Sequence, residues 1–235
     1  MKLLSIRLVL SCNLCCNTCP QKDKVLHPLD YVHPNGFRIN RLTNESLFKW
    51  IDEYTPSSEW LIDLTGGEPG MYPEIGTLVP ELSRRGYHGV IRTNGTLPIP
   101  KDPNFIRVAT WHAKTKNIPP YYDVIQILSP NPYDTTDAKI QYCIDNNIPY
   151  QAKKFIDYTK GEKDKGEYIT EPLRLEGMLR ITNVGMITNC YAAKGINGYS
   201  IFKMSKPRLI QFFDETCPMC HMAYDVERHI PKEWL

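Results

Sequence analysis

The sequence has no long apolar run and no strong excess of charge of either sign. Its 235 residues include 28 Lys and Arg against 26 Asp and Glu, which gives a formal net charge of +2. A balance this small does not indicate a nucleic-acid or membrane-surface partner. No stretch approaches the ~20 consecutive apolar residues that a membrane helix needs. Internal repeats and low-complexity tracts are also missing, so no repeat architecture is predicted.

The first residues lack the pattern of a secretion signal. The stretch "KLLSIRLVL" is apolar, but it is short and broken by Arg7, and three further cysteines follow soon after Cys12. We therefore expect a cytoplasmic protein. The length suits one domain of moderate size, or one domain with a small appendage, whose core needs no disulfides.

Cysteine, by contrast, is plentiful and clustered. The eight cysteines form two groups and one isolated residue: Cys12, Cys15, Cys16 and Cys19; Cys190, Cys217 and Cys220; and Cys143. A secreted domain would spread its cysteines among loops as a disulfide framework. Close spacing in a chain without a signal peptide favours metal binding instead.

Apolar periodicity predicts strands that alternate with helices. The expected strands cover residues 3–10, 59–64, 90–91, 105–111, 124–128 and 150–156. The expected helices cover residues 44–54 with Asn44 as N-cap, 73–85 ended by Gly86, and 134–146. Alternation of this kind implies βαβ units and a parallel sheet, and right-handed crossovers curl six such strands into an open barrel. We predict an α/β fold, a partial (β/α)6 barrel.

The composition changes after residue 157. The charged run 158–168 is typical of a linker or an exposed loop. Beyond it, "LRLEGMLRITNVGMITNC" predicts a β-hairpin with its turn near Asn183–Gly185, and a short helix is expected over 205–213. We predict a core domain over 1–157 and a small hairpin-plus-helix extension over 158–235.

Two metals fit the first cysteine group. A zinc knuckle would use the C-x2-C pairs Cys12/Cys15 or Cys16/Cys19, although four ligands here would force adjacent residues onto one ion. Alternatively, Cys12, Cys16 and Cys19 have the spacing C-x3-C-x2-C, and three thiolates on one loop can hold three irons of a [4Fe–4S] cluster. The fourth iron would then be open to a small molecule.

The C-x3-C-x2-C loop after a first strand resembles the signature of the radical S-adenosylmethionine (SAM) superfamily. "GGEP" at 66–69 and "TNGT" at 93–96 resemble motifs that this superfamily has after its second and third strands. The resemblance covers roughly residues 3–156. It implies a [4Fe–4S] cluster on the three cysteines, SAM on the open iron, and an electron donor such as flavodoxin or ferredoxin.

The same resemblance implies which residues contact SAM. The carbonyls of Gly66 and Gly67 and the side chain of Glu68 would accept hydrogen bonds from its ammonium group. Further SAM-binding residues are expected at Pro69, Thr93, Asn94 and Thr110. Thr18 departs from the family, which usually has an aromatic residue before the third cysteine, close to the adenine.

Two strand ends offer candidate catalytic residues. In "TWHAK", alternation would place Thr110, His112 and Lys114 on one face, toward SAM or substrate. For His112, a core histidine is the other interpretation. In the sixth strand, alternation places Gln151 and Lys153 on one face and Lys154 on the other. A lysine on the inward face is costly unless it is paired, so we expect Lys153 or Lys154 to meet a carboxylate of the substrate or of a glutamate. A surface position remains the alternative.

The second cysteine group resembles the twitch extension, a shortened SPASM domain of radical SAM enzymes. "GMITNC" ends in Cys190, and "CPMC" supplies Cys217 and Cys220. The resemblance implies an auxiliary [4Fe–4S] cluster that binds substrate or accepts an electron, although a further cysteine of the pattern is missing. Candidates for a fourth ligand are Glu171, Glu176, His221 and Asp225. A Cys3His zinc site completed by His221 is the alternative.

These features predict a radical SAM enzyme, an oxidoreductase or modifying enzyme. It would abstract a hydrogen atom from a small polar molecule or a peptide, with a slight preference for the small molecule. One alternative is an enzyme resembling 7-carboxy-7-deazaguanine synthase, which shares the small core but needs no auxiliary cluster. Another is a zinc-stabilised binding protein without catalysis.

Overall fold

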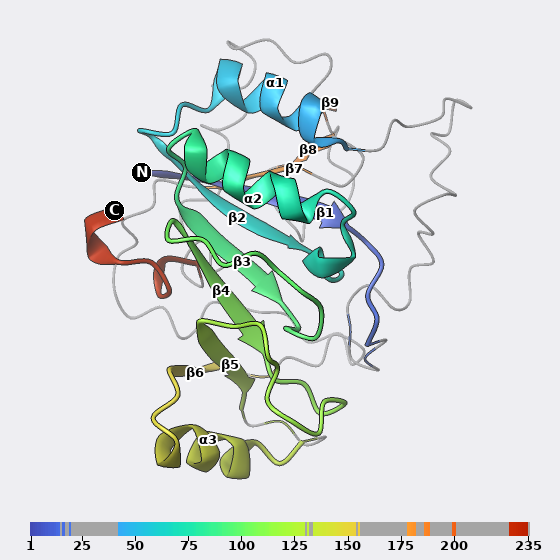
Figure 1. The fold of residues 1–235 in the computed structure, drawn as a ribbon, viewed down its shortest axis with the longest axis vertical. Coiled ribbons are helices and arrows are strands. Elements are labelled where there is room, and N and C mark those ends of the chain that lie inside the picture. Colours follow the sequence, from blue (N-terminus) through green and yellow to red (C-terminus); the bar gives the residue numbers. More distant parts are fainter. Residues whose placement is uncertain are drawn as a thin grey trace.

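A mostly parallel β-sheet with helices on one face organises the molecule (Figure 1). The computed structural model describes residues 1–14, 16, 19, 42–129, 131, 134–153, 155, 178–181, 186–188, 199–200 and 226–234. Among these residues the sheet has nine strands, in the order β6-β5-β4-β3-β2-β1-β7-β8-β9. The first six are β1 (Lys2–Val9), β2 (Trp60–Gly66), β3 (Gly89–Thr93), β4 (Phe105–Thr110), β5 (Val124–Leu128) and β6 (Tyr150–Lys153).

The strands β1 to β6 lie side by side in sequence order, and every neighbouring pair is parallel. Within the described residues β6 pairs with β5 but with no further strand, so the sheet stays open. The predicted α/β fold with a six-stranded parallel sheet is confirmed. All six carboxyl ends meet at one edge of this sheet, which is where parallel sheets usually bind ligands.

Two helices cover one face of the sheet, α1 (Asn44–Tyr54) and α2 (Ile75–Arg84), and a short helical turn η1 (Pro69–Met71) precedes α2. Their apolar stripes, which include the fully buried Leu47 and Leu78, pack against the main core. The predicted N-cap of α1 was wrong by one residue: the Thr43 hydroxyl accepts from the backbone N–H of Ser46. The Asn44 side chain turns instead toward Glu74 and Thr77 of the α2 region.

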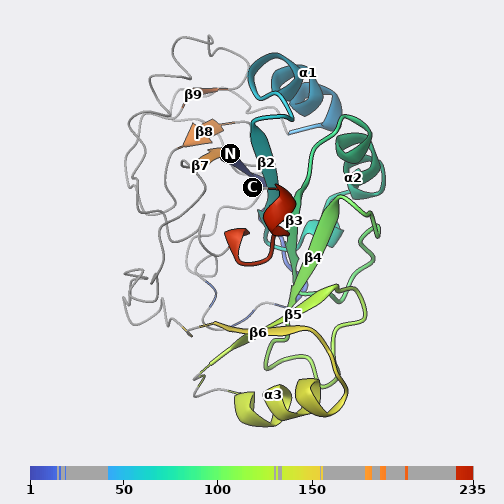
Figure 2. The same cartoon turned by 90° about the vertical axis from the view of Figure 1, so that its left-hand side faces the viewer.

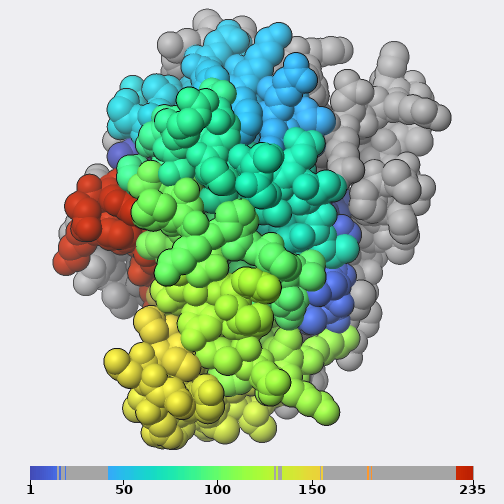
Figure 3. Space-filling view, in the orientation of Figure 1, coloured from blue at the N-terminus to red at the C-terminus, as the bar shows by residue number. Residues whose placement is uncertain are grey.

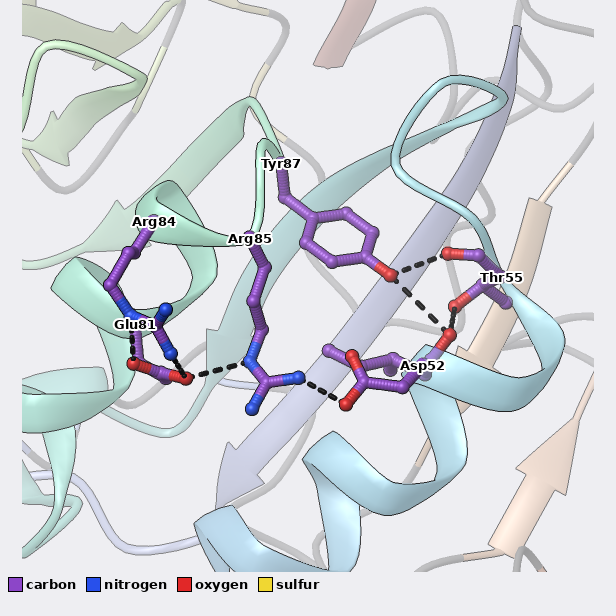
Figure 4. A network of polar contacts seen from close by, with 7 residues as sticks. Asp52, Thr55, Glu81, Arg84, Arg85 and Tyr87 are labelled. Atoms are coloured by element: carbon purple, nitrogen blue, oxygen red, sulfur yellow. Dashed lines mark hydrogen bonds and ion pairs between the residues drawn. The ribbon is translucent and has the colours of Figure 1, made fainter.

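Charged side chains join α1 to α2 at the surface (Figure 4). Arg85 donates to Glu81 at 2.8 Å and also pairs with Asp52 of α1. Next to this pair, the Tyr87 hydroxyl donates to the carbonyl of Thr55 at 2.6 Å, a buried contact. Exposed ion pairs stabilise a fold by only about 0–1 kcal/mol. The buried apolar stripes therefore provide most of the free energy that keeps the two helices on the sheet, and the ion pairs add little.

The third helix, α3 (Thr136–Asp145), lies at the far end of the molecule from α1 (Figure 3). It joins β5 to β6 and packs a smaller core that contains Trp111, Ile125 and the buried Cys143. Loops without a helix, residues 94–104 and 111–123, connect β3 to β4 and β4 to β5. None of the helices in the described part of the chain has the length and hydropathy needed to cross a membrane.

The carboxyl-terminal segment 226–234 lies on the sheet face opposite α1 and α2 (Figure 2). We call this face, opposite α1 and α2, the inner face of the sheet. Val226 and Ile230 pack there against Leu61, Val90 and Val108. Strands from the predicted extension also join the sheet: β7 (Met178–Ile181) pairs in parallel with β1, followed by β8 (Met186–Thr188) and β9 (Tyr199–Ser200). The antiparallel pairing of β7 with β8 confirms the predicted hairpin. The proposed boundary at 157/158 and the expected helix 205–213 lie outside the described residues.

Candidate functional site

The first cysteine group begins directly after β1, at the carboxyl edge of the sheet. Cys12, Cys16 and Cys19 are partly buried, and the backbone N–H of Cys19 donates to the carbonyl of Cys16 at 3.2 Å. Within the described part of the chain, no three His, Cys, Asp or Glu side chains are gathered closely enough to hold a metal ion. The three thiols lie on one loop, but their sulfur atoms would have to move closer together to ligate one cluster.

The GGEP motif after β2 holds the start of this loop. The backbone N–H of Gly67 donates to the carbonyl of Val9 at 2.7 Å, and that of Glu68 donates to the carbonyl of Ser11 at 2.9 Å. A Cβ atom on Gly67 would lie 2.1 Å from the carbonyl oxygen of Ser11. Glycine is therefore required by the close approach of two backbone segments, one of which leads into Cys12.

The carboxylate of Glu68 is fully buried and joins the ends of β2 and β3. It accepts three hydrogen bonds: from the backbone N–H of Gly70 at 2.9 Å, from the Thr93 hydroxyl at 2.6 Å, and from the backbone N–H of Asn94 at 2.7 Å. A carboxylate offers about four acceptor sites. Three of them are therefore used by described residues of the protein, which fixes the carboxylate between the ends of β2 and β3.

The TNGT motif after β3 reaches across to the cysteine loop. Asn94 donates from its side-chain amide to Asn13 Oδ1 at 2.8 Å and lies 3.6 Å from the sulfur of Cys12. Asn13 in turn donates to the hydroxyl of Thr96 at 2.8 Å. Gly95 has a φ of +68°, a left-handed conformation that suits glycine in this tight turn. Both predicted motifs therefore contact the segment that carries Cys12.

His112 brings the end of β4 to the same loop, because its Nδ1 lies 3.6 Å from the sulfur of Cys16. The strand ends at Thr110, and a turn from His112 to Thr115 leaves Lys114 exposed. The strand alternation predicted to continue to Lys114 was therefore wrong for Lys114, whereas the His112 side chain lies beside the cysteine loop. Burial lowers the pKa of His112 to about 4, and the Lys139 cation contributes, so the imidazole is neutral at pH 7.

Lys139 of α3 fixes the segment that carries His112. Its buried ammonium group donates to the carbonyls of Trp111 at 3.1 Å and His112 at 3.0 Å, and pairs with the Asp134 carboxylate at 2.5 Å. The same group lies 5.1 Å from the ring centroid of Trp111. A buried lysine with this many partners fixes the backbone at Trp111 and His112, and this backbone in turn limits where the His112 ring can lie.

The inner face of the sheet carries polar side chains on β4, β5 and β6. Thr110, Gln126 and Gln151 are neighbours across these strands, and the first two side chains lie 3.3 Å apart. Gln151 and Lys153 are partly buried, whereas Tyr150 is exposed, so the predicted common face of Gln151 and Lys153 is confirmed. Whether Lys153 meets a substrate carboxylate stays a prediction.

The carboxyl-terminal segment adds His229 and Arg228 to this inner face. In the amide orientation that satisfies both neighbours, Gln151 donates to His229 Nε2 at 2.8 Å and accepts from Arg228 at 2.7 and 3.0 Å. The pKa of His229 is lowered to about 4, mainly by burial and also by the cations of Arg228, Arg92 and Lys153, while Asp63 opposes them. Asp63 is fully buried and accepts from Arg92 Nε at 2.8 Å.

This buried histidine predicts a loss of stability in mild acid. The unfolded chain takes up a proton near pH 6.5, whereas the folded chain does so only near pH 4. His229 therefore contributes stability above pH 6.5, and this contribution, up to about 3 kcal/mol, disappears as the pH falls toward 4. Urea unfolding between pH 7.5 and about pH 4 is expected to give a shallower pH dependence for His229→Gln than for wild type. A slope equal to that of wild type, or of the control His88→Gln, would contradict this account.

Several predicted site residues lie outside the described residues. They are Thr18, Cys190, Cys217 and Cys220, together with the candidate ligands Glu171, Glu176, His221 and Asp225. The contacts of Asn13, Lys139, Arg228 and His229 were not predicted. Apart from the pair of Lys139 with Asp134, these contacts join residues 27 or more positions apart in the chain, and the sequence carries no signal for them.

The described residues fit an iron–sulfur ligand set in their chemistry. Three thiols at C-x3-C-x2-C spacing follow β1, and the Asn94 amide after β3 and the His112 imidazole after β4 lie next to two of the sulfur atoms. Hydrogen-bond donors of this kind surround thiolates that ligate metals. The fold and the site thus define an α/β protein with a thiol-bearing loop at the carboxyl edge of a parallel sheet.

Comparison with solved structures gives the same fold. SuiB from Streptococcus suis bound to S-adenosylmethionine matches with a TM-score of 0.56 and 15% identity, over 91% of this chain and 64% of that one. A second structure of SuiB matches with a TM-score of 0.52 and 12% identity, over 91% and 65%. The chain thus spans about two thirds of SuiB, and at these identities the similarity concerns the fold.

The remaining comparisons give no further support for a fold or a family. QueE from Escherichia coli matches over 48% of this chain and 64% of that one, with 18% identity and a TM-score of 0.32. That score is too low to support a shared fold. No family model and no curated protein matches the chain.

Proposed function

We propose that the protein is a radical SAM enzyme that uses a [4Fe–4S] cluster on Cys12, Cys16 and Cys19. One observation carries the proposal: the GGEP and TNGT motifs both contact the cysteine-bearing loop at one edge of a parallel sheet. Their order in the chain resembles that superfamily, and a protein of similar fold binds S-adenosylmethionine.

Within this proposal the chain positions its cofactors rather than performing the bond cleavage. Three thiolates would hold three irons and leave the fourth for the amine and carboxylate of SAM. The cluster, when bound, supplies the electron that cleaves SAM. Glu68 and the carbonyls of Gly66 and Gly67 are the proposed partners of the SAM ammonium group, and Pro69, Thr93 and Thr110 are proposed to contact SAM at the same edge.

The inner face of the sheet is the proposed substrate surface. Thr110, Gln126, Gln151 and Lys153 place hydrogen-bonding groups there, beside the carboxyl edge that carries the cysteines. Such a lining suits a small polar molecule or a peptide segment. His112 and Lys153 are the proposed reactive side chains. We also propose that Cys190, Cys217 and Cys220 hold an auxiliary [4Fe–4S] cluster and that a flavodoxin or ferredoxin reduces the enzyme.

Metal and sulfide content after anaerobic reconstitution tests this proposal. Wild type is expected to hold about eight irons, and the triple variant Cys190/Cys217/Cys220→Ala about four. Four irons in both proteins would contradict the auxiliary cluster and leave the first one standing. Bound zinc without iron or sulfide would contradict both, and would indicate a zinc-stabilised protein.

A further inference from the structure

The amide of Asn94 has one possible orientation. Its Oδ1 accepts from the backbone N–H of Thr96 at 3.0 Å and from the hydroxyl of Thr96 at 2.6 Å. A backbone N–H can only donate, so the oxygen must face Thr96 and the nitrogen must face the cysteine loop. The two amide hydrogens then point to Asn13 Oδ1 and to the sulfur of Cys12. All four hydrogen-bonding positions of this side chain are used.

His112 presents a similar donor to Cys16. The His112 Nδ1 lies 3.6 Å from the sulfur of Cys16, and an imidazole carries a hydrogen on at least one ring nitrogen. A thiolate can only accept, and therefore Nδ1 carries the hydrogen when Cys16 ligates iron. Lys139 holds the backbone at His112 through two carbonyls, which limits how far the ring can move from the sulfur.

We propose that Asn94 and His112 are positioning residues for the cysteine loop, which they hold by hydrogen bonds to the sulfur atoms of Cys12 and Cys16. The positioning of the loop does not depend on a cluster, whereas the following effect on a cluster rests on the proposed function. Once the thiolates ligate a cluster, the same two donors raise its reduction potential. The reduced cluster carries one more negative charge, so donors to its sulfur ligands stabilise the reduced form more than the oxidised form.

The effect on the loop can be measured without any metal. In the full-length apo protein, hydrogen exchange of the amides in residues 9–14 is expected to be about fivefold faster in Asn94→Ala than in wild type. Asn104→Ala is the matched control, because Asn104 donates to Ser83 at 2.9 Å, far from the cysteines in the chain. Its exchange over residues 9–14 is expected to equal that of wild type.

The effect on the cluster is measured by a redox titration followed by electron paramagnetic resonance. At a fixed applied potential, His112→Phe is expected to lower the ratio of reduced to oxidised cluster about tenfold, which corresponds to about 59 mV for one electron. His112→Asn keeps an N–H near the position of Nδ1 and is expected to restore most of the ratio. Asn94→Ala is expected to act in the same direction as His112→Phe.

The outcomes separate this inference from the proposed function. Unchanged exchange over residues 9–14 in Asn94→Ala would overturn the inference, and so would an unchanged potential in both His112→Phe and Asn94→Ala. If wild type takes up no cluster while exchange in Asn94→Ala is still accelerated, the proposed function fails and the positioning role of Asn94 stands.

Discussion

Alanine in place of Cys12, Cys16 or Cys19 is expected to remove about four irons per chain and the associated sulfide. Each of these residues is proposed to hold one iron, and a cluster with only two remaining protein ligands is lost readily. Iron and sulfide assays after anaerobic reconstitution measure the loss. Circular dichroism is expected to stay near that of wild type, because the three thiols are only partly buried and lie outside the core.

Cys15 provides the control in the same loop. It lies outside the C-x3-C-x2-C spacing, so Cys15→Ala is expected to keep the wild-type iron content. Equal loss of iron in Cys15→Ala and Cys16→Ala would contradict the assignment and favour a site that uses C-x2-C pairs, as zinc sites do.

Gly67→Ala is expected to have the second-largest effect, on both stability and cluster loading. The added methyl carbon would lie 2.1 Å from the carbonyl oxygen of Ser11 and 2.5 Å from that of Leu10. These are backbone atoms, so the methyl group cannot be accommodated by a side-chain rotation. The contacts that hold Val9–Ser11 against the GGEP motif must break or shift, at a cost of about 2–3 kcal/mol. Urea unfolding and iron content after reconstitution measure the two effects.

Gly76→Ala is the matched control for this substitution. Gly76 lies on the exposed side of α2, and a Cβ there would meet no heavy atom within 4 Å. The change is expected to stabilise the helix by up to about 1 kcal/mol and to leave iron content unaltered. Gly67→Ala with wild-type stability and full iron content would show that the close approach to Ser11 has no consequence for the loop.

Much of the fold could be predicted because local patterns determine it. The strand at 124–128 and the helix at 44–54 have the predicted bounds, since apolar spacing and neighbouring turns mark their ends. The N-cap of that helix could not be predicted. Asn44 and Thr43 are both good caps in sequence, and contacts of Asn44 with Glu74 and Thr77 decide between them.

The site was predictable as motifs but not as contacts. The order of the cysteine loop, GGEP and TNGT along the chain placed all three at one sheet edge. That Glu68 bonds to Thr93 and Asn94, however, depends on how two strand ends meet in space. The end of β4 was misjudged for a similar reason, because Lys139 binds the carbonyls that follow Thr110 and turns the chain there.

The polar cover of the inner face was not predicted. The contacts of Gln151 with Arg228 and His229 join residues more than 70 positions apart, and no spacing rule connects them. They also show that the end of the chain packs on the same sheet as the predicted core. An inward lysine on β6 could be anticipated from alternation, but its surroundings could not.

Cleavage of SAM by the reconstituted and reduced protein tests the central claim most directly. The account predicts that 5′-deoxyadenosine forms together with methionine, as measured by mass spectrometry, and that Cys16→Ala forms neither. Wild-type protein that holds its full iron and sulfide, yet forms no 5′-deoxyadenosine when reduced in the presence of SAM, would contradict the account.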